Sequence, residues 1–360
     1  SDLVRAVTVT PYVPQEIARE DTPFLEYSFT GPYTLEALRA HLDDDVIPAL
    51  AEVEGVANAQ ALGGRRRRLE IRLDPEKARS LGVAPDARDA FLPSMGVNGP
   101  MARNVGDLAM LLSVMAGYDA RAPLSLEGDG ARFLERLDSD VKGKRIAWAG
   151  DFKGYLPYEP GVLETCRGAL KVFEDMGCVV EEAVPDYPVD AVWRAWLVIR
   201  AWQSGGGLLA LYNDPARRAQ MKPEAIYEVE RGLRLSAFDV TAASVTRTEW
   251  YQAVRRFFER YDFLVLPTAQ LFAFDVGKHW PDEIAGVKMT TYHEWMKGVL
   301  PISMTGCPVL AAPAGFGVAG LPVGIQIVAP NRGEMDLLRL GSAYDAATNW
   351  SARRPPALAQ

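Results

Sequence analysis

Residues that bind metals or build disulfide frameworks are scarce in this sequence. Its 360 residues include three cysteines and three histidines, and none of them is spaced as CxxC, HxxxH or HExxH. Structural zinc sites and disulfide-stabilised domains need such clusters. We therefore expect no metal site, no cofactor and no disulfide. Unpaired thiols of this kind are typical of a cytoplasmic protein.

An excess of positive charge is also absent. The chain has 39 Lys and Arg against 47 Asp and Glu, which gives a net charge of −8. Proteins that bind nucleic acid generally present a basic surface to the phosphates, so we expect no nucleic-acid partner. The basic run from Arg65 to Arg68 is interpreted as the solvated end of a hairpin.

Segments typical of membrane spans or signal peptides are missing as well. The 33 residues from Gly298 to Pro330 carry no charge and are long enough to cross a bilayer. They contain five prolines and six glycines, which would leave backbone groups unpaired in lipid. Apolar segments interrupted in this way are typical of buried strands and tight turns. We therefore expect no membrane span, no signal peptide and a cytoplasmic location.

What is present is the composition of a globular protein with about two domains, with 48% hydrophobic and 24% charged residues. Residues 1–88 predict a small α+β unit in ferredoxin-like order, with a strand at Phe24 to Gly31 and a helix at Thr34 to Val53. Residues 89–98 lie in a segment rich in Ala, Pro, Gly and Asp, which predicts a linker. Residues 99–353 form the second expected domain.

The second domain has the pattern of an α/β protein. A strand at 144–150, a helix at 161–177 and a strand at 178–183 predict a parallel βαβ unit. The remaining expected elements are helices at 189–203, 223–235, 240–261 and 334–348 and strands at 262–268, 308–315 and 320–330.

The first domain resembles a known family. VTVTPYVPQEIAREDTPFLEYSFTG, EVEGVANAQALGG and RRRRLEIRLDPEKARSLGV are similar to part of the porter domain of resistance-nodulation-division efflux transporters. The resemblance covers about a quarter of the chain. Proton-coupled pumping needs ionisable residues inside the membrane, so transport is not expected of a chain without a membrane span.

The second domain resembles the amidase signature family over residues 91–350. The resemblance is carried by GPMARNVGDLAMLLSVMAG, YDFLVLPTAQ, SMTGCPVLAAPAGF and GLPVGIQIVAP, in the order that the family has them. It implies an α/β fold with a mixed sheet flanked by helices, of which this chain has a part. It also implies hydrolysis of amide C–N bonds in a small amide substrate.

The same resemblance implies a catalytic Lys, a bridging Ser in a cis peptide bond and a nucleophilic Ser, the two serines in or beside a Gly/Ser-rich loop upstream of GPMAR. In that arrangement a neutral Lys activates the hydroxyl through the bridging Ser. No such loop exists between Ser1 and Gly99. We therefore assign no catalytic residue and expect no amidase activity from this chain alone.

Other nucleophiles and bases are poorly placed in the sequence. Ser204 precedes a glycine run but lies inside an apolar helical segment, not on a strand-to-helix turn. Cys307 is flanked by apolar strand residues and is interpreted as a core thiol. His279 and His293 bracket a loop-and-helix segment and are interpreted as surface or loop histidines.

Two stretches match family segments that run close to the substrate pocket. They give the candidate pocket residues Pro267, Thr268, Met304, Thr305, Gly306, Cys307 and Pro308. Gly306 would permit close backbone approach, and Thr268 would offer a hydroxyl. That these residues only turn and pack the sheet is an equally open interpretation.

Two other functions stay open at this point. In one, the chain is a non-catalytic fusion or fragment. In the other, it is a binding module in which the porter-like unit docks a partner by its sheet edge. Uncovered sheet edges also predict self-association.

Overall fold

The computed structural model describes residues 8–12, 26–30, 42, 46–47, 95–96, 99–120 and 122–353. The chain divides into two compact units, Ser1–Lys77 and Ala78–Gln360. In the first unit, β1 (Thr8–Tyr12) pairs antiparallel with β2 (Glu26–Thr30), where the sequence predicts a strand. Most of the expected helix, the hairpin and most of the linker lie outside the described residues, so the ferredoxin-like order stays a prediction.

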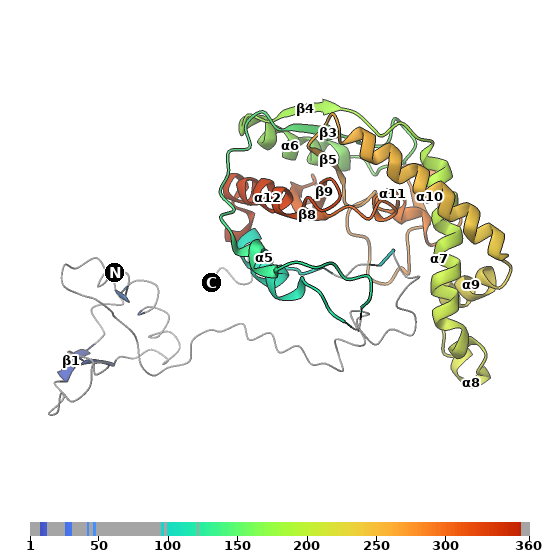
Figure 1. The fold of residues 1–360 in the computed structure, drawn as a ribbon, viewed down its shortest axis with the longest axis horizontal. Helices are drawn as coiled ribbons and strands as arrows, with labels where there is room; N and C mark the ends of the chain where they lie inside the picture. Colours follow the sequence, from blue (N-terminus) through green and yellow to red (C-terminus); the bar gives the residue numbers. More distant parts are fainter. Residues whose placement is uncertain are drawn as a thin grey trace. The chain divides into compact units, whose positions relative to one another are not determined.

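A five-stranded mixed sheet organises the second unit (Figure 1). Its order is β4-β3-β5-β9-β8. β3 runs parallel to β4 and β5, whereas β9 is antiparallel to both β5 and β8. The strands are β3 (Arg145–Trp148), β4 (Val179–Glu182), β5 (Phe263–Pro267), β8 (Val309–Phe316) and β9 (Pro322–Val328). The α/β class and the mixed sheet flanked by helices are thus confirmed.

The predicted parallel βαβ unit is β3, α6 (Val162–Asp175) and β4. At the start of α6, the Gly161 N–H donates to the Glu164 carboxylate at 3.0 Å, which satisfies a backbone donor that the helix itself cannot. Val162, Cys166 and Phe173 recur at helical spacing and are buried against the sheet core. Every residue of β5 is buried, as expected of a central strand with both faces covered.

Three helices pack together beside the sheet (Figure 1): α7 (Val189–Tyr212), α9 (Pro223–Gly232) and α10 (Ala237–Phe257). α7 runs nine residues past its expected end at Gln203 and includes Ser204 and the glycine run that follows it. A Cβ on Gly205 would lie 2.8 Å from the Glu228 carbonyl of α9. Gly205 therefore permits the close approach of α7 and α9, whereas a Cβ on Gly206 or Gly207 would meet no described atom within 4 Å.

The charge-free stretch from Gly298 to Pro330 forms α11 (Leu300–Ser303), β8 and β9. After it, α12 (Glu334–Thr348) stacks its Tyr344 ring on Phe173 of α6, with ring centroids 4.9 Å apart. No helix in the described part of the chain has the length and apolar character to cross a membrane. The remaining elements are α5 (Val105–Met115), α8 (Pro215–Arg218), β6 (Glu283–Ile284), β7 (Val287–Lys288) and the 3-10 helices η2 (Gly130–Leu134), η3 (Glu294–Met296) and η4 (Trp350–Ala352).

Candidate functional site

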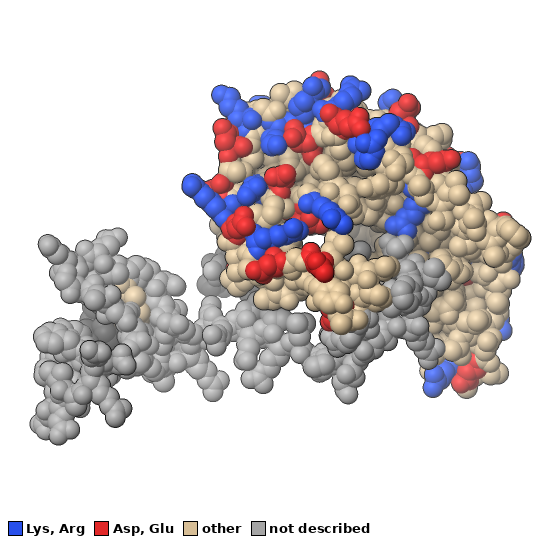
Figure 2. Space-filling view, in the orientation of Figure 1, with Lys and Arg blue, Asp and Glu red and all other residues tan. Residues whose placement is uncertain are grey.

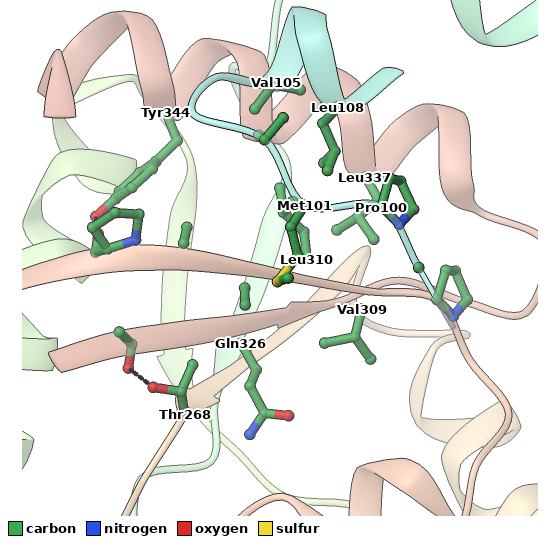
Figure 3. Close-up of a pocket in the computed structure, with 18 of the residues that line it drawn as sticks. Pro100, Met101, Val105, Leu108, Thr268, Val309, Leu310, Gln326, Leu337 and Tyr344 are labelled. Atoms are coloured by element: carbon green, nitrogen blue, oxygen red, sulfur yellow. Dashed lines mark hydrogen bonds between the residues drawn. The ribbon is translucent and has the colours of Figure 1, made fainter. Parts of the chain in front are cut away.

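A groove of about 1370 Å³ surrounds the edge of the sheet formed by β8. Its walls come from α5, α12, the β8–β9 hairpin and the segment that follows β5. Figure 3 shows Val105, Leu108, Leu337 and Tyr344 on one side of the β8–β9 strands, and Thr268 and Gln326 on the other. The groove therefore has an apolar helical side and a more polar side.

The helical side is fixed by the start of α5. The Asn104 side chain accepts a hydrogen bond from the Asp107 N–H at 2.7 Å, the usual N-cap arrangement. The first N–H of the helix, that of Val105, donates to the Asp345 carboxylate of α12 at 3.3 Å. Because α5 and α12 share this contact, the two helices form one continuous wall.

The polar side is built on the ends of β5 and β9. The Thr268 hydroxyl donates to the Gly324 carbonyl at 3.1 Å. Gln326 donates from Nε2 to the Pro267 carbonyl at 2.9 Å. A carboxamide has a separate acceptor oxygen, so Gln326 keeps Oε1 for a ligand in the groove. These two side chains therefore offer acceptor oxygens to a group that donates hydrogen bonds.

The expected 304–308 segment enters the groove only in part. Gly306, Cys307 and Pro308 line it together with Thr268, whereas Pro267, Met304 and Thr305 are not among its lining residues. Thr305 is buried and shapes the turn: its hydroxyl donates to the Ile302 carbonyl at 2.7 Å and accepts from the Cys307 N–H at 3.0 Å. Whether any of the seven residues contacts substrate stays a prediction.

Gly306 has a backbone conformation that favours glycine. Its φ is +68°, a left-handed conformation that side chains with a Cβ rarely adopt. A Cβ there would meet no described atom within 4 Å. The backbone conformation is thus one reason for the glycine, and a close approach of substrate to its backbone stays a prediction.

No activated nucleophile lines the groove in the described part of the chain. The hydroxyls of Thr268, Ser303, Tyr344 and Thr348 all donate to backbone carbonyls, and no Lys or His is among the described lining residues. Burial raises the pKa of the Cys307 thiol, which keeps it protonated and weakly nucleophilic at neutral pH.

The other candidates lie away from the groove. Ser204 is inside α7, as its sequence context indicated. His279 is exposed, in agreement with the surface interpretation. His293 lies in a turn, as the loop alternative allows, but it is not at the surface: it is fully buried and lies 2.7 Å from the Glu228 carboxylate. The carboxylate that stabilises this burial is 65 residues away in the chain.

Glu228 is the centre of a buried polar cluster. Its Oε1 also accepts from the Tyr292 hydroxyl at 2.6 Å and from Arg200 Nε at 3.1 Å. Burial alone would raise the pKa of this carboxyl, but the hydrogen bonds from His293 and Tyr292 outweigh burial and bring it to about 2. The cluster ties α7 and α9 to the segment before α11. In the part of the chain that the structure describes, no group of three His, Cys, Asp or Glu side chains is arranged to hold a metal ion.

Comparison with known proteins agrees with this architecture. The amidase family model matches residues 80–338. The chain is 31% identical to an acylamidase of Rhodococcus erythropolis over 261 residues, 72% of this chain and 54% of the relative. It is 29% identical to one component of the glutamyl-tRNA(Gln) amidotransferase of Chloroflexus aurantiacus over 292 residues, 74% of this chain and 57% of the relative.

Solved structures show the same fold. A bacterial aryl acylamidase of the amidase signature family matches with a TM-score of 0.65 and 25% identity, covering 75% of this chain and 58% of that one. A 6-aminohexanoate cyclic dimer hydrolase matches with a TM-score of 0.61 and 21% identity, covering 71% and 56%. The chain therefore belongs to the amidase family, and it spans a little over half the length of the relatives it matches.

The family match begins earlier in the chain than the sequence analysis expected. It begins at residue 80, before the expected start at Phe91, and so includes residues interpreted as the end of the porter-like unit and the linker. The porter resemblance of residues 1–88 gains no support from these comparisons and stays a prediction. Gln326 was missed by the sequence analysis, although a lone polar residue in the apolar strand GIQIV was a usable signal.

Proposed function

We propose that this chain carries the substrate-binding part of an amide C–N hydrolase and does not itself supply the nucleophile. The observation behind the proposal is the hydrogen bonding of the described groove hydroxyls, each of which donates to a backbone carbonyl. A serine or threonine attacks an amide only when a base removes its proton. In the part of the chain that the structure describes, none of these hydroxyls donates to a Lys, His or carboxylate side chain.

The groove fits an amide with an apolar substituent. An amide N–H would donate to Gln326 Oε1, and the Thr268 oxygen has lone pairs left to accept a second hydrogen bond. Phe272 and Phe274, which line the groove in the segment that follows Thr268, would receive an aryl or alkyl group. The amide oxygen would need hydrogen-bond donors of its own, and the Thr268 hydroxyl and one Gln326 N–H are already bonded to the Gly324 and Pro267 carbonyls.

The test of inactivity is a turnover assay on purified full chain. We expect no hydrolysis of aryl or aliphatic amides above the buffer rate, because the described groove hydroxyls are all bonded to backbone carbonyls. Labelling with a serine-directed phosphonate should also leave the intact mass unchanged. Turnover that the phosphonate abolishes would contradict the proposal, and Ser204→Ala would then be the first variant to make.

Binding separates this proposal from a fusion or fragment without function, which also predicts no turnover. We expect an anilide such as acetanilide to perturb the NMR signals of Gln326 and Thr268. Gln326→Leu should weaken this binding by about tenfold, the cost of one lost hydrogen bond of about 1.4 kcal/mol. Gln252→Leu, on exposed α10 surface, is the control. No anilide binding at millimolar concentration would favour the non-functional alternative.

A further inference from the structure

The ring of Phe272 separates the groove from two glycines that lie behind it. Phe272 lines the groove, whereas Gly161 and Gly317 are not among its described lining residues. A Cβ on Gly317 would lie 2.4 Å from Phe272 Cζ, and a Cβ on Gly161 would lie 3.5 Å from Phe272 Cε2. The ring therefore fills the space between the start of α6 and the β8–β9 turn. Without the ring, the groove would extend to both glycines.

The backbone that carries this ring is fixed by hydrogen bonds to the loop before α6. The Phe272 N–H donates to the Glu159 carboxylate at 2.9 Å. The Glu159 N–H in turn donates to the Gln270 carbonyl at 2.8 Å. Phe272 is also only 9% exposed and belongs to the main hydrophobic core. A side chain held by packing and by backbone hydrogen bonds forms a rigid wall of the groove.

The side chain of Gln270 fixes the same segment from the interior. Gln270 is fully buried. Its Nε2 donates to the Pro157 carbonyl at 3.1 Å, and its Oε1 accepts from the Gly298 N–H at 3.1 Å. A buried carboxamide that is bonded at both its nitrogen and its oxygen has little freedom to move. The segment that carries Phe272 is therefore bound both to the loop before α6 and to the segment before α11.

Charge contributes little to selection in the groove. Its described lining residues include three charged ones, Arg103, Glu334 and Asp345. Arg103 donates to a backbone carbonyl at 2.8 Å, Asp345 accepts from the backbone of α5, and Glu334 lies 3.7 Å from an arginine of η2. On the face drawn in Figure 2, Lys and Arg are likewise intermixed with Asp and Glu. Selection among neutral ligands therefore depends on the size and shape of the groove walls.

We propose that Phe272 determines the size of the substituent that the groove accepts beside the amide group. This inference rests on the proposed function, in which Thr268 and Gln326 hold the amide. Thr268 and Phe272 lie in one segment and both line the groove, so a substituent on the bound amide meets the Phe272 ring. The substrate class is a neutral amide with a single-ring or short alkyl substituent, because the Phe272 ring fills the space that a second ring would need.

The test compares acetanilide with its naphthyl analogue in NMR titrations of the full chain. We expect the unmodified chain to bind acetanilide more tightly. Phe272→Ala should lower the ratio of the naphthyl to the phenyl dissociation constant by about tenfold or more, a usual extent of discrimination by one apolar group. The control is Phe274→Ala. Phe274 also lines the groove but packs against Trp295, so its loss should weaken both ligands alike and leave the ratio unchanged.

Phe272→Ala also removes core packing, so a second variant tests the inference in the opposite direction. The Cβ of Gly317→Ala would displace the Phe272 ring, and the fixed backbone leaves the groove as the direction in which the ring can move. We expect this variant to bind acetanilide about tenfold more weakly. Gly206→Ala on α7, whose Cβ would meet no described atom within 4 Å, is the matched control and should leave binding unchanged.

The outcomes separate this inference from the proposed function. If the unmodified chain binds no acetanilide, the proposed function and this inference both fail. If acetanilide binds but Phe272→Ala leaves the ratio unchanged, or Phe274→Ala lowers it equally, only this inference is overturned. The same holds if Gly317→Ala binds acetanilide as tightly as the unmodified chain does.

Discussion

Close packing between α12 and β8 depends on one residue without a side chain. A Cβ on Gly341 would lie 2.2 Å from Leu310 Cδ2, far inside van der Waals contact. Gly168 on α6 is the opposite case, because it is exposed and a Cβ there would meet no described atom within 4 Å. Both glycines lie in helices, so replacing either with alanine brings the same gain in helix propensity. Only the change at Gly341 also introduces a steric clash.

We expect Gly341→Ala to destabilise the protein by about 1 to 3 kcal/mol, the usual cost of overpacking a filled core. Gly168→Ala should stabilise it by up to about 1 kcal/mol, because alanine is the better helix former. Urea unfolding of both variants is the measurement. Equal effects of the two changes would show that the contact is not the cause. The same conclusion would follow if Leu310→Ala, added to Gly341→Ala, restored none of the lost stability.

At the scale of elements, the cluster at Glu228 joins parts of the chain that are distant in sequence. It links α7, α9 and the segment that leads through α11 into the groove. Glu228 is 2% exposed, and three donors converge on the same oxygen. A buried carboxylate is tolerated only when such partners replace its hydration. The cluster therefore fixes the relative position of these elements.

This cluster predicts a specific acid sensitivity. The carboxyl pKa is lowered from 4.5 to about 2 by folding, so its contribution is complete above pH 4.5 and is lost as pH falls toward 2. We expect Glu228→Gln to cost about 2 to 3 kcal/mol at neutral pH and to flatten the decline of stability between pH 4.5 and 2. Denaturant unfolding across this range is the measurement.

The matched control is Glu230→Gln on the same helix. Glu230 is 40% exposed and pairs with Arg218 at 3.2 Å, and surface pairs of this kind contribute about 0 to 1 kcal/mol. Its replacement should therefore change stability little at any pH. If both variants lost the same stability with the same pH dependence, the burial of Glu228 would not be the source of the effect.

At the scale of the whole molecule, the chain holds two compact units, and we propose that they unfold independently. Leu38 lies in the predicted helix of the first unit, on its apolar stripe. We expect Leu38→Asp to leave the main calorimetric transition unchanged, whereas Val265→Asp in the fully buried β5 should abolish it. A single transition that Leu38→Asp shifts throughout would show one shared core.

Local patterns were sufficient for most elements of the second unit. The 3.6-residue period and its end signals placed the last helix at 334–348, the observed bounds of α12. The βαβ unit and the β8 and β9 strands were also predicted, because strand and helix periodicity is written in neighbouring residues. The amidase family followed from motif order, which is likewise a property of the linear chain.

Contacts between distant residues decided the rest. α7 continues past Gln203 and packs on α9, where Gly205 leaves room for the Glu228 carbonyl. His293 is buried because Glu228, on another helix, accepts its hydrogen bond. The groove exists because β8 ends the described sheet and α5 packs on α12. The sequence by itself determined the elements and the family, since these depend on local periodicity and motif order. Only the tertiary structure decided which side chains are buried, which meet in the groove and which edge is left open, because burial depends on residues far apart in the chain.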